Sequence, residues 1–121
     1  MEDDSVYKVP VFMQQALRDL VHELVDRNYV GLEADRRAGI LNAGQLKQAI
    51  TNYGGTLLDL PAEAFEPQFA TTYPKTNQRG QWLVDLTLWT EEEGPSDLTL
   101  QVRVQPTTDN VLLTIEDIHV M

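Results

Sequence analysis

Apolar and polar positions follow two periods along the chain, three to four residues in the first half and two residues near the end. After Pro10, apolar residues recur at the spacing of one helix face. This stripe consists of Met13, Leu17, Leu20, Val21, Leu24 and Val25. Because proline suits the first turn of a helix, the pattern predicts a helix of about five turns that ends near Asn28.

A second helix is predicted between Asn42 and Tyr53. Asn42 is a capping residue, and Gln45 stands three positions later, where its side chain can return a hydrogen bond to the cap. Apolar residues at helical spacing follow, namely Leu46, Ala49, Ile50 and Tyr53. Gly54 and Gly55 then end the helix, because glycine accepts the left-handed conformation found at helix ends.

The connector between the two predicted helices carries apolar residues that we expect to pack beneath a sheet. These are Tyr29, Val30, Leu32, Ile40 and Leu41. It also holds the only dibasic pair, Arg36-Arg37. An anion site is one interpretation of this pair, and a solvated pair that balances Glu33 and Asp35 is the favoured one.

From Gln81 onward apolar residues alternate with polar ones, which is typical of strands with one packed face. The runs predict an antiparallel meander in which Leu88 faces Leu100 and Asp85 faces Arg103. The fold class that follows is α+β, with two N-terminal helices packed on an antiparallel sheet of three to five strands that ends in this C-terminal meander. We expect one domain over residues 1–121, with residues 1–8 as a flexible tail.

Composition and charge narrow the classes of partner. The 121 residues include no cysteine and carry a net charge of −10. An acidic surface repels phosphate backbones and anionic lipids, so nucleic acid and membranes are excluded in favour of a basic protein. The start of the chain is acidic and lacks the basic, then apolar pattern of a signal peptide, so we expect a cytoplasmic protein.

The stretch between the first two meander strands is the candidate partner-binding surface. It contains Glu91, Glu92, Glu93 and Asp97, beside Trp89, which the alternation places on the outer face. An aromatic anchor among charges is typical of interfaces. The alternative is a solvated hairpin tip that spans residues 91–97. The carboxylate spacing is not that of a calcium loop, and we expect no metal, no cofactor and no catalytic residue.

Asp117 and His119 form the one pair that resembles site chemistry. Two residues apart on a strand, they are expected to share the packed side with Ile115. A carboxylate beside an imidazole orients it for base chemistry. The alternative is that the strand leaves the sheet and both side chains are wet. If the helices close over a pocket instead, we expect that pocket to be lined by Tyr53, Tyr73, Asp117 and His119.

The segments "LWTEEEGPSDLTL" and "IEDIHVM" resemble a family of small, uncharacterised bacterial proteins known as a domain of unknown function. The residues that match are Trp89, Thr90, Glu92, Glu93, Gly94, Ser96, Asp97, Leu98, Thr99, Asp117, His119 and Val120. Pro95 stands where that pattern has a basic residue. The resemblance covers most of the chain and implies a bacterial cytosolic protein without an assigned activity.

Two functions of different classes remain from the sequence. The leading hypothesis is a non-catalytic acidic binding protein that neutralises a basic partner, in the manner of an immunity protein. The alternative is a small-ligand-binding or enzymatic α+β cone with a pocket between helices and sheet.

Overall fold

A computed structural model describes residues 8–39, 41–74 and 80–120, and its helices precede its sheet. Helix α1 spans Val11–Val25, α2 spans Tyr29–Ala34, and α3 spans Ala43–Tyr53. A 3₁₀ turn, η1, follows at Ala62–Phe65. The predictions for the tail of residues 1–7 and for Ile40 lie outside the described residues.

The predicted α1 stripe is confirmed, because Met13, Leu17, Leu20, Val21 and Leu24 are all buried. The helix ends at Val25, three residues earlier than predicted. Arg27, just beyond it, takes a φ of 61°, which lies outside the right-handed helical region. The chain therefore leaves the helix before Asn28, whose side chain accepts a hydrogen bond from the Gly31 amide and caps α2.

Helix α2 lies in the segment that the sequence had shown only as a connector. Leu32 is fully buried, as expected, whereas Val30 is 75% exposed, so its predicted burial is wrong. Side chains two residues apart on a helix point to nearly opposite sides, so Val30 and Leu32 cannot both reach the core.

Helix α3 begins with the predicted capping box. The Asn42 side chain accepts from the Gln45 amide at 2.8 Å, and the Gln45 side chain accepts from the Asn42 amide at 2.9 Å. The helix gives way to Gly54, which has a φ of 84°. Leu46 and Ile50 are the buried members of its stripe.

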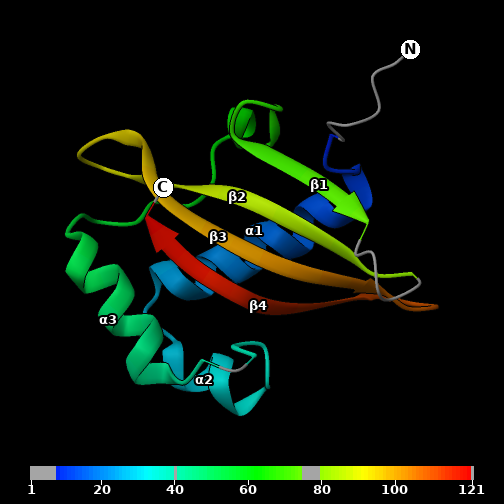
Figure 1. Ribbon diagram of the computed structural model, residues 1–121, viewed down its shortest axis with the longest axis horizontal. Helices are drawn as coiled ribbons and strands as arrows, with labels where there is room; N and C mark the ends of the chain where they lie inside the picture. The colour runs from blue at the N-terminus through cyan, green and yellow to red at the C-terminus, as the bar shows by residue number, and fades with distance from the viewer. Residues whose placement is uncertain (1–7, 40, 75–79, 121) are drawn as a thin grey trace.

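The sheet has the predicted meander topology. Its four antiparallel strands are β1 (Ala70–Pro74), β2 (Trp82–Thr90), β3 (Gly94–Pro106) and β4 (Val111–Val120), in the order β1-β2-β3-β4. Figure 1 shows the strands side by side, with α1 passing behind them and α3 beside the C-terminal end of β4.

The predicted register between β2 and β3 is wrong by two residues. Leu86 pairs with Leu100, and Asp85 pairs with Gln101 rather than with Arg103. The reason is a turn shorter than predicted, since β3 already begins at Gly94, and extra β3 residues bulge out before Thr99. A shift of two residues keeps every side chain on its predicted face.

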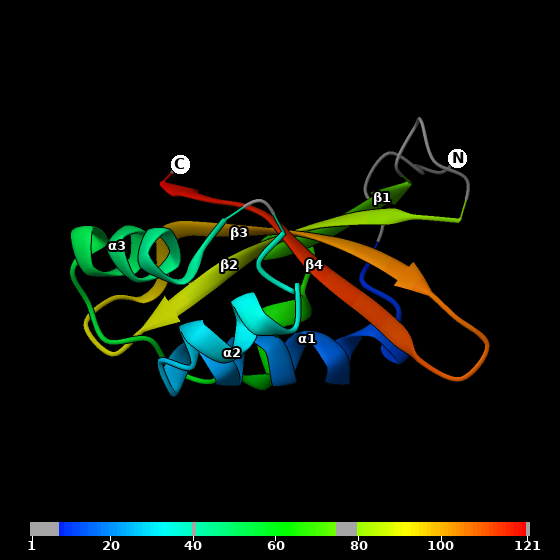
Figure 2. The same cartoon turned by 90° about the horizontal axis from the view of Figure 1, so that it is seen from below.

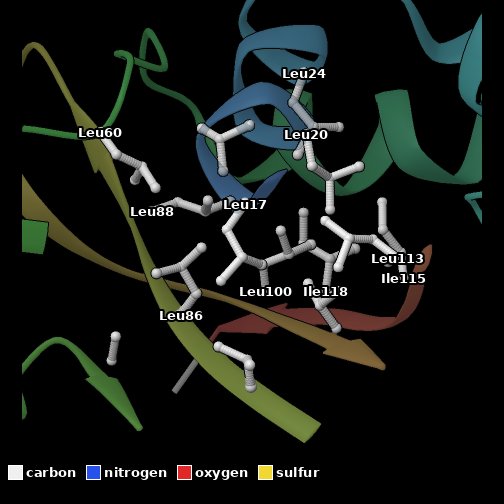
Figure 3. Packing of buried hydrophobic residues seen from close by; sticks show 14 of the residues in the cluster. Leu17, Leu20, Leu24, Leu60, Leu86, Leu88, Leu100, Leu113, Ile115 and Ile118 are labelled. Atoms are coloured by element: carbon white, nitrogen blue, oxygen red, sulfur yellow. The ribbon is translucent and has the colours of Figure 1, made fainter. Parts of the chain in front are cut away.

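The core lies between α1 and the face of the sheet that α1 covers. Leu17 points toward Leu88 and Leu100, and all three side chains are fully buried (Figure 3). Figure 2 shows α1 and α2 on this one side of the sheet. No described helix crosses the other side, which we call the open face. Its side chains include Thr71, Tyr73, Leu83, Asp85, Thr87, Thr99, Gln101, Arg103, Thr114, Glu116, Asp117 and His119.

Candidate functional site

The acidic loop is a three-residue turn, and it is docked against the end of α3. Glu92 accepts hydrogen bonds from the amide and the hydroxyl of Thr56, at 2.8 and 3.1 Å. The Thr56 amide holds the pKa of the Glu92 carboxyl below its ordinary value. Glu92 therefore ties the turn to the segment that follows Gly55.

Glu93 makes a second tie to the same helix. The Tyr53 hydroxyl donates to Glu93 Oε1 at 2.5 Å and accepts from the Asp97 amide at 3.0 Å. The bond to Glu93 raises the pKa of the Tyr53 phenol. The Glu91 carboxylate, by contrast, has no partner among the described residues. All three glutamates are exposed, and among them only Glu91 makes no side-chain hydrogen bond within the described residues.

This arrangement predicts different outcomes for neighbouring glutamates. Glu92→Ala should lower the melting temperature, because the Thr56 amide and hydroxyl both lose their acceptor. Glu91→Ala, the matched control, should leave the melting temperature unchanged. The contribution of Glu92 to the stability of the fold is present above its unfolded pKa of about 4.5. It is lost as the pH falls through the lowered folded pKa. Equal melting temperatures for both variants from pH 5 to 7 would contradict the docking.

The alternation had placed Trp89 on the outer face, where it would be exposed, but the structure shows it buried. It is 8% exposed, and its ring meets the Phe69 ring edge-on with centroids 5.0 Å apart. Phe69 directly precedes the edge strand β1 and covers the indole. The indole Nε1 is buried and has no hydrogen-bond partner in the described part of the chain.

Asp117 and His119 lie on the open face, so their predicted place on the packed side with Ile115 is wrong. Val102 pairs with Ile115 while Gln101 pairs with Asp117, which leaves Glu116 as an extra residue in β4. One extra residue reverses the alternation that follows it. His119 Nδ1 lies 2.8 Å from Asp117 Oδ2, although the contact is not aligned as a hydrogen bond.

A hydrogen-bonded cluster occupies the centre of the open face. The Tyr73 hydroxyl donates to Asp85 Oδ2 at 3.1 Å. Gln101 Nε2 donates to Asp85 Oδ1 at 3.0 Å and to the Tyr73 hydroxyl at 3.1 Å. Burial, followed by the charge of Asp85, raises the pKa of the Tyr73 phenol. Both carboxylate oxygens of Asp85 are thus held in place by neutral donors.

Asp85 also lacks a compensating charge among the residues that the structure describes. None of the described cationic side chains forms an ion pair with it, and the predicted partner, Arg103, instead lies 3.3 Å from Glu116. An open hollow of about 220 Å³ adjoins the carboxylate and is lined by Phe69 and by the threonines at 71, 87 and 99. A carboxylate, hydroxyl groups and an aromatic edge are groups that a lysine or arginine side chain can contact. The sequence missed Asp85 and Gln101 because their pairing depends on the register.

The four residues of the predicted pocket do not meet beneath the helices. Tyr73, Asp117 and His119 lie on the open face, whereas Tyr53 holds the acidic turn. The hollow of about 540 Å³ between α1, the turn after α2 and β4 is lined by others, among them Asp19, Arg37 and Leu113.

His22 lies outside these clusters and joins α1 to the segment that precedes η1. Its Nδ1 lies 2.8 Å from Asp59, and its Nε2 lies 3.2 Å from Asp26. The hydrogen bond with Asp59 and the charge of Asp26 raise the pKa of the imidazole above 6.5.

We therefore expect His22 to titrate above pH 6.5 in an NMR titration, and Asp59→Asn to lower its pKa. Because the folded pKa of His22 is raised, its contacts with Asp59 and Asp26 stabilise the folded protein fully below pH 6.5. This stabilisation is lost as the pH rises through the folded pKa. Asp109→Asn, a change to an exposed carboxylate in the turn before β4, is the control. A His22 pKa at or below 6.5 would contradict the contact.

Within the described residues, no helix is long and apolar enough to cross a membrane. In the same part of the chain, no three histidine, aspartate or glutamate side chains gather as metal ligands would.

Comparison with known proteins gives one match. Residues 21–121 match a family model described as a domain of unknown function (DUF7668). This confirms the resemblance to a domain of unknown function. Neither curated proteins nor solved structures gave a match.

Proposed function

We propose that this chain, which belongs to the DUF7668 family of unknown function, is a non-catalytic binding protein that takes a basic segment of a partner protein on its open face. The observation that carries the proposal is the Asp85 carboxylate, which Tyr73 and Gln101 hold in a fixed position and which forms no ion pair within the described part of the chain. In type this resembles a cytoplasmic bacterial immunity protein, which neutralises a basic toxin by contact alone.

Preorganisation supports the proposal. A carboxylate whose oxygens are already oriented loses little conformational freedom when a guanidinium or ammonium group arrives. Tyrosine presents a large, amphipathic contact surface at low entropic cost, and the neighbouring hollow beside Phe69 has room for the stem of a lysine or arginine.

Charge supports the same class of partner. The net charge of −10 attracts a basic protein over distances up to about a Debye length, near 8 Å at physiological salt. On the open face itself, Asp85, Glu116 and Asp117 outnumber Arg103. Long-range attraction and the local contact therefore favour the same partner.

The test is a titration with an oligoarginine peptide, followed by amide NMR shifts and calorimetry. Shifts should map to the open face around Asp85. Asp85→Asn should weaken binding by about tenfold, the equivalent of about 1.4 kcal/mol for a lost charge-assisted bond. Asp109→Asn, which changes the net charge equally, should have a much smaller effect.

Two outcomes would overturn the proposal. Equal weakening by Asp85→Asn and Asp109→Asn would show that only net charge matters. Binding that is lost in Glu91→Lys and Asp97→Lys but kept in Asp85→Asn would move the contact to the acidic turn and away from the open face.

A further inference from the structure

The segment from Arg36 to Gly39 folds tightly across the edge of β4. The Ile115 amide donates to the Arg37 carbonyl at 2.6 Å. A Cβ on Gly39 would lie 2.4 Å from the Ile115 carbonyl oxygen, so only glycine fits there. This contact falls at the β4 bulge, where Glu116 is the extra residue. The segment is thus held in a defined place beside the open face.

Arg36 occupies this segment in a conformation that arginine seldom adopts. Its φ is 63°, in the left-handed region where glycine and asparagine are the usual residues. No property of the turn itself calls for an arginine at that position. Arg27 shares this conformation, so the surroundings of the Arg36 side chain, and not its backbone alone, decide whether it has a role.

Arg36 and Arg37 differ in what neutralises them. Arg37 Nη2 lies 2.9 Å from Glu23 and 2.9 Å from Asp35. Arg36 is exposed and has no ion-pair partner among the described residues. Of the expected solvated pair that balances Glu33 and Asp35, only the contact of Arg37 with Asp35 is found, and the second partner of Arg37 is Glu23.

Arg36 and Arg103 line the same open hollow, which measures about 510 Å³. Thr114 adds a hydroxyl to the lining, and among the described lining residues only Glu116 adds a carboxylate. Arg103 Nη1 lies 3.3 Å from Glu116, which leaves its other guanidinium donors available. The hollow therefore combines two guanidinium groups with one carboxylate, a net positive site on a chain of net charge −10.

We propose that this hollow is an oxyanion site, in which Arg36 and Arg103 bind a phosphate or carboxylate group. Guanidinium groups match such groups with paired hydrogen bonds. The site goes beyond the binding of a basic segment, since it takes a ligand of opposite charge at the β4 edge. Its ligand is either a free oxyanion or an acidic side chain of a partner.

The test is an amide NMR titration of the full chain with inorganic phosphate, against sodium chloride at matched ionic strength. Phosphate should give saturable shifts in the segment Ala38–Gly39 and in β4 at Thr114–Glu116. Arg36→Gly removes the guanidinium and suits the backbone φ, so the variant should fold and bind phosphate about tenfold or more weakly.

Arg27→Gly is a closely matched control. Arg27 is also exposed, also has a positive φ of 61°, and loses the same charge. The Arg27→Gly variant should leave phosphate binding unchanged. Equal weakening by both variants would overturn the proposal.

A second arm separates the two sources of the oxyanion. A glutamate-rich peptide is titrated under the same conditions. Saturation by phosphate alone, sensitive to Arg36→Gly, indicates a free oxyanion. Saturation by the peptide alone, with the same sensitivity, indicates an acidic side chain of a partner. Failure of both probes rejects the site.

Discussion

Replacing Gly39 with alanine should destabilise the protein by roughly 2–5 kcal/mol, the sum of left-handed backbone strain and a steric clash. Its φ is 66°, and the added Cβ would lie 2.4 Å from the Ile115 carbonyl oxygen and 3.1 Å from Thr114 Cγ2. Neither backbone can move freely, because the Ile115 amide is bonded to the Arg37 carbonyl. Urea denaturation measures the decrease in the free energy of unfolding.

Gly94→Ala separates the two contributions. Gly94 has a φ of 75°, but nothing lies within 4 Å of the position its Cβ would take. The loss of stability in Gly94→Ala should be limited to the backbone strain, about 1–2 kcal/mol. A loss at Gly39 no larger than that at Gly94 would show that the segment does not press against β4.

Leu17→Ala should cost about 2–5 kcal/mol, the usual range for a leucine removed from a core. Leu17 is fully buried at the middle of α1, where its neighbours Leu88 and Leu100 are equally buried (Figure 3). Rigid strands cannot collapse into the space that the side chain leaves. The loss is comparable to much of the stability of a small domain.

Leu112→Ala makes the same chemical change at the surface. Leu112 is 54% exposed, so its removal should alter the free energy of unfolding by no more than about 0.5 kcal/mol. A loss below 1 kcal/mol for Leu17→Ala would mean that α1 is not packed closely on the sheet.

The elements that could be predicted are those with repeated signals. The α1 stripe repeats its apolar spacing over four turns, and the meander repeats its alternation on each strand. The capping box needs only Asn42 and Gln45, three residues apart. Signals of this kind are local, because they depend on which side of one element meets the core.

The site could not be predicted in the same way, because it depends on single inserted residues. Glu116 reverses the alternation of β4, and nothing in "IEDIHV" marks it as the extra residue. Gly94 and Pro95 look like loop residues yet begin β3, which moves Asp85 from Arg103 to Gln101. Glu92 and Glu93 looked free because their partners, Thr56 and Tyr53, lie 36 and 40 residues away in the chain.

The two outermost strands limit how this protein can aggregate. β1 is short and ends in Pro74, which has no amide hydrogen to offer to another strand. On the opposite side, the Ile115 amide of β4 is already satisfied by the Arg37 carbonyl. Unpaired strand edges are templates for cross-β stacking, and here one edge is short while the other is interrupted at Ile115. Copies of the chain that meet through their sheets are thus steered away from fibril growth.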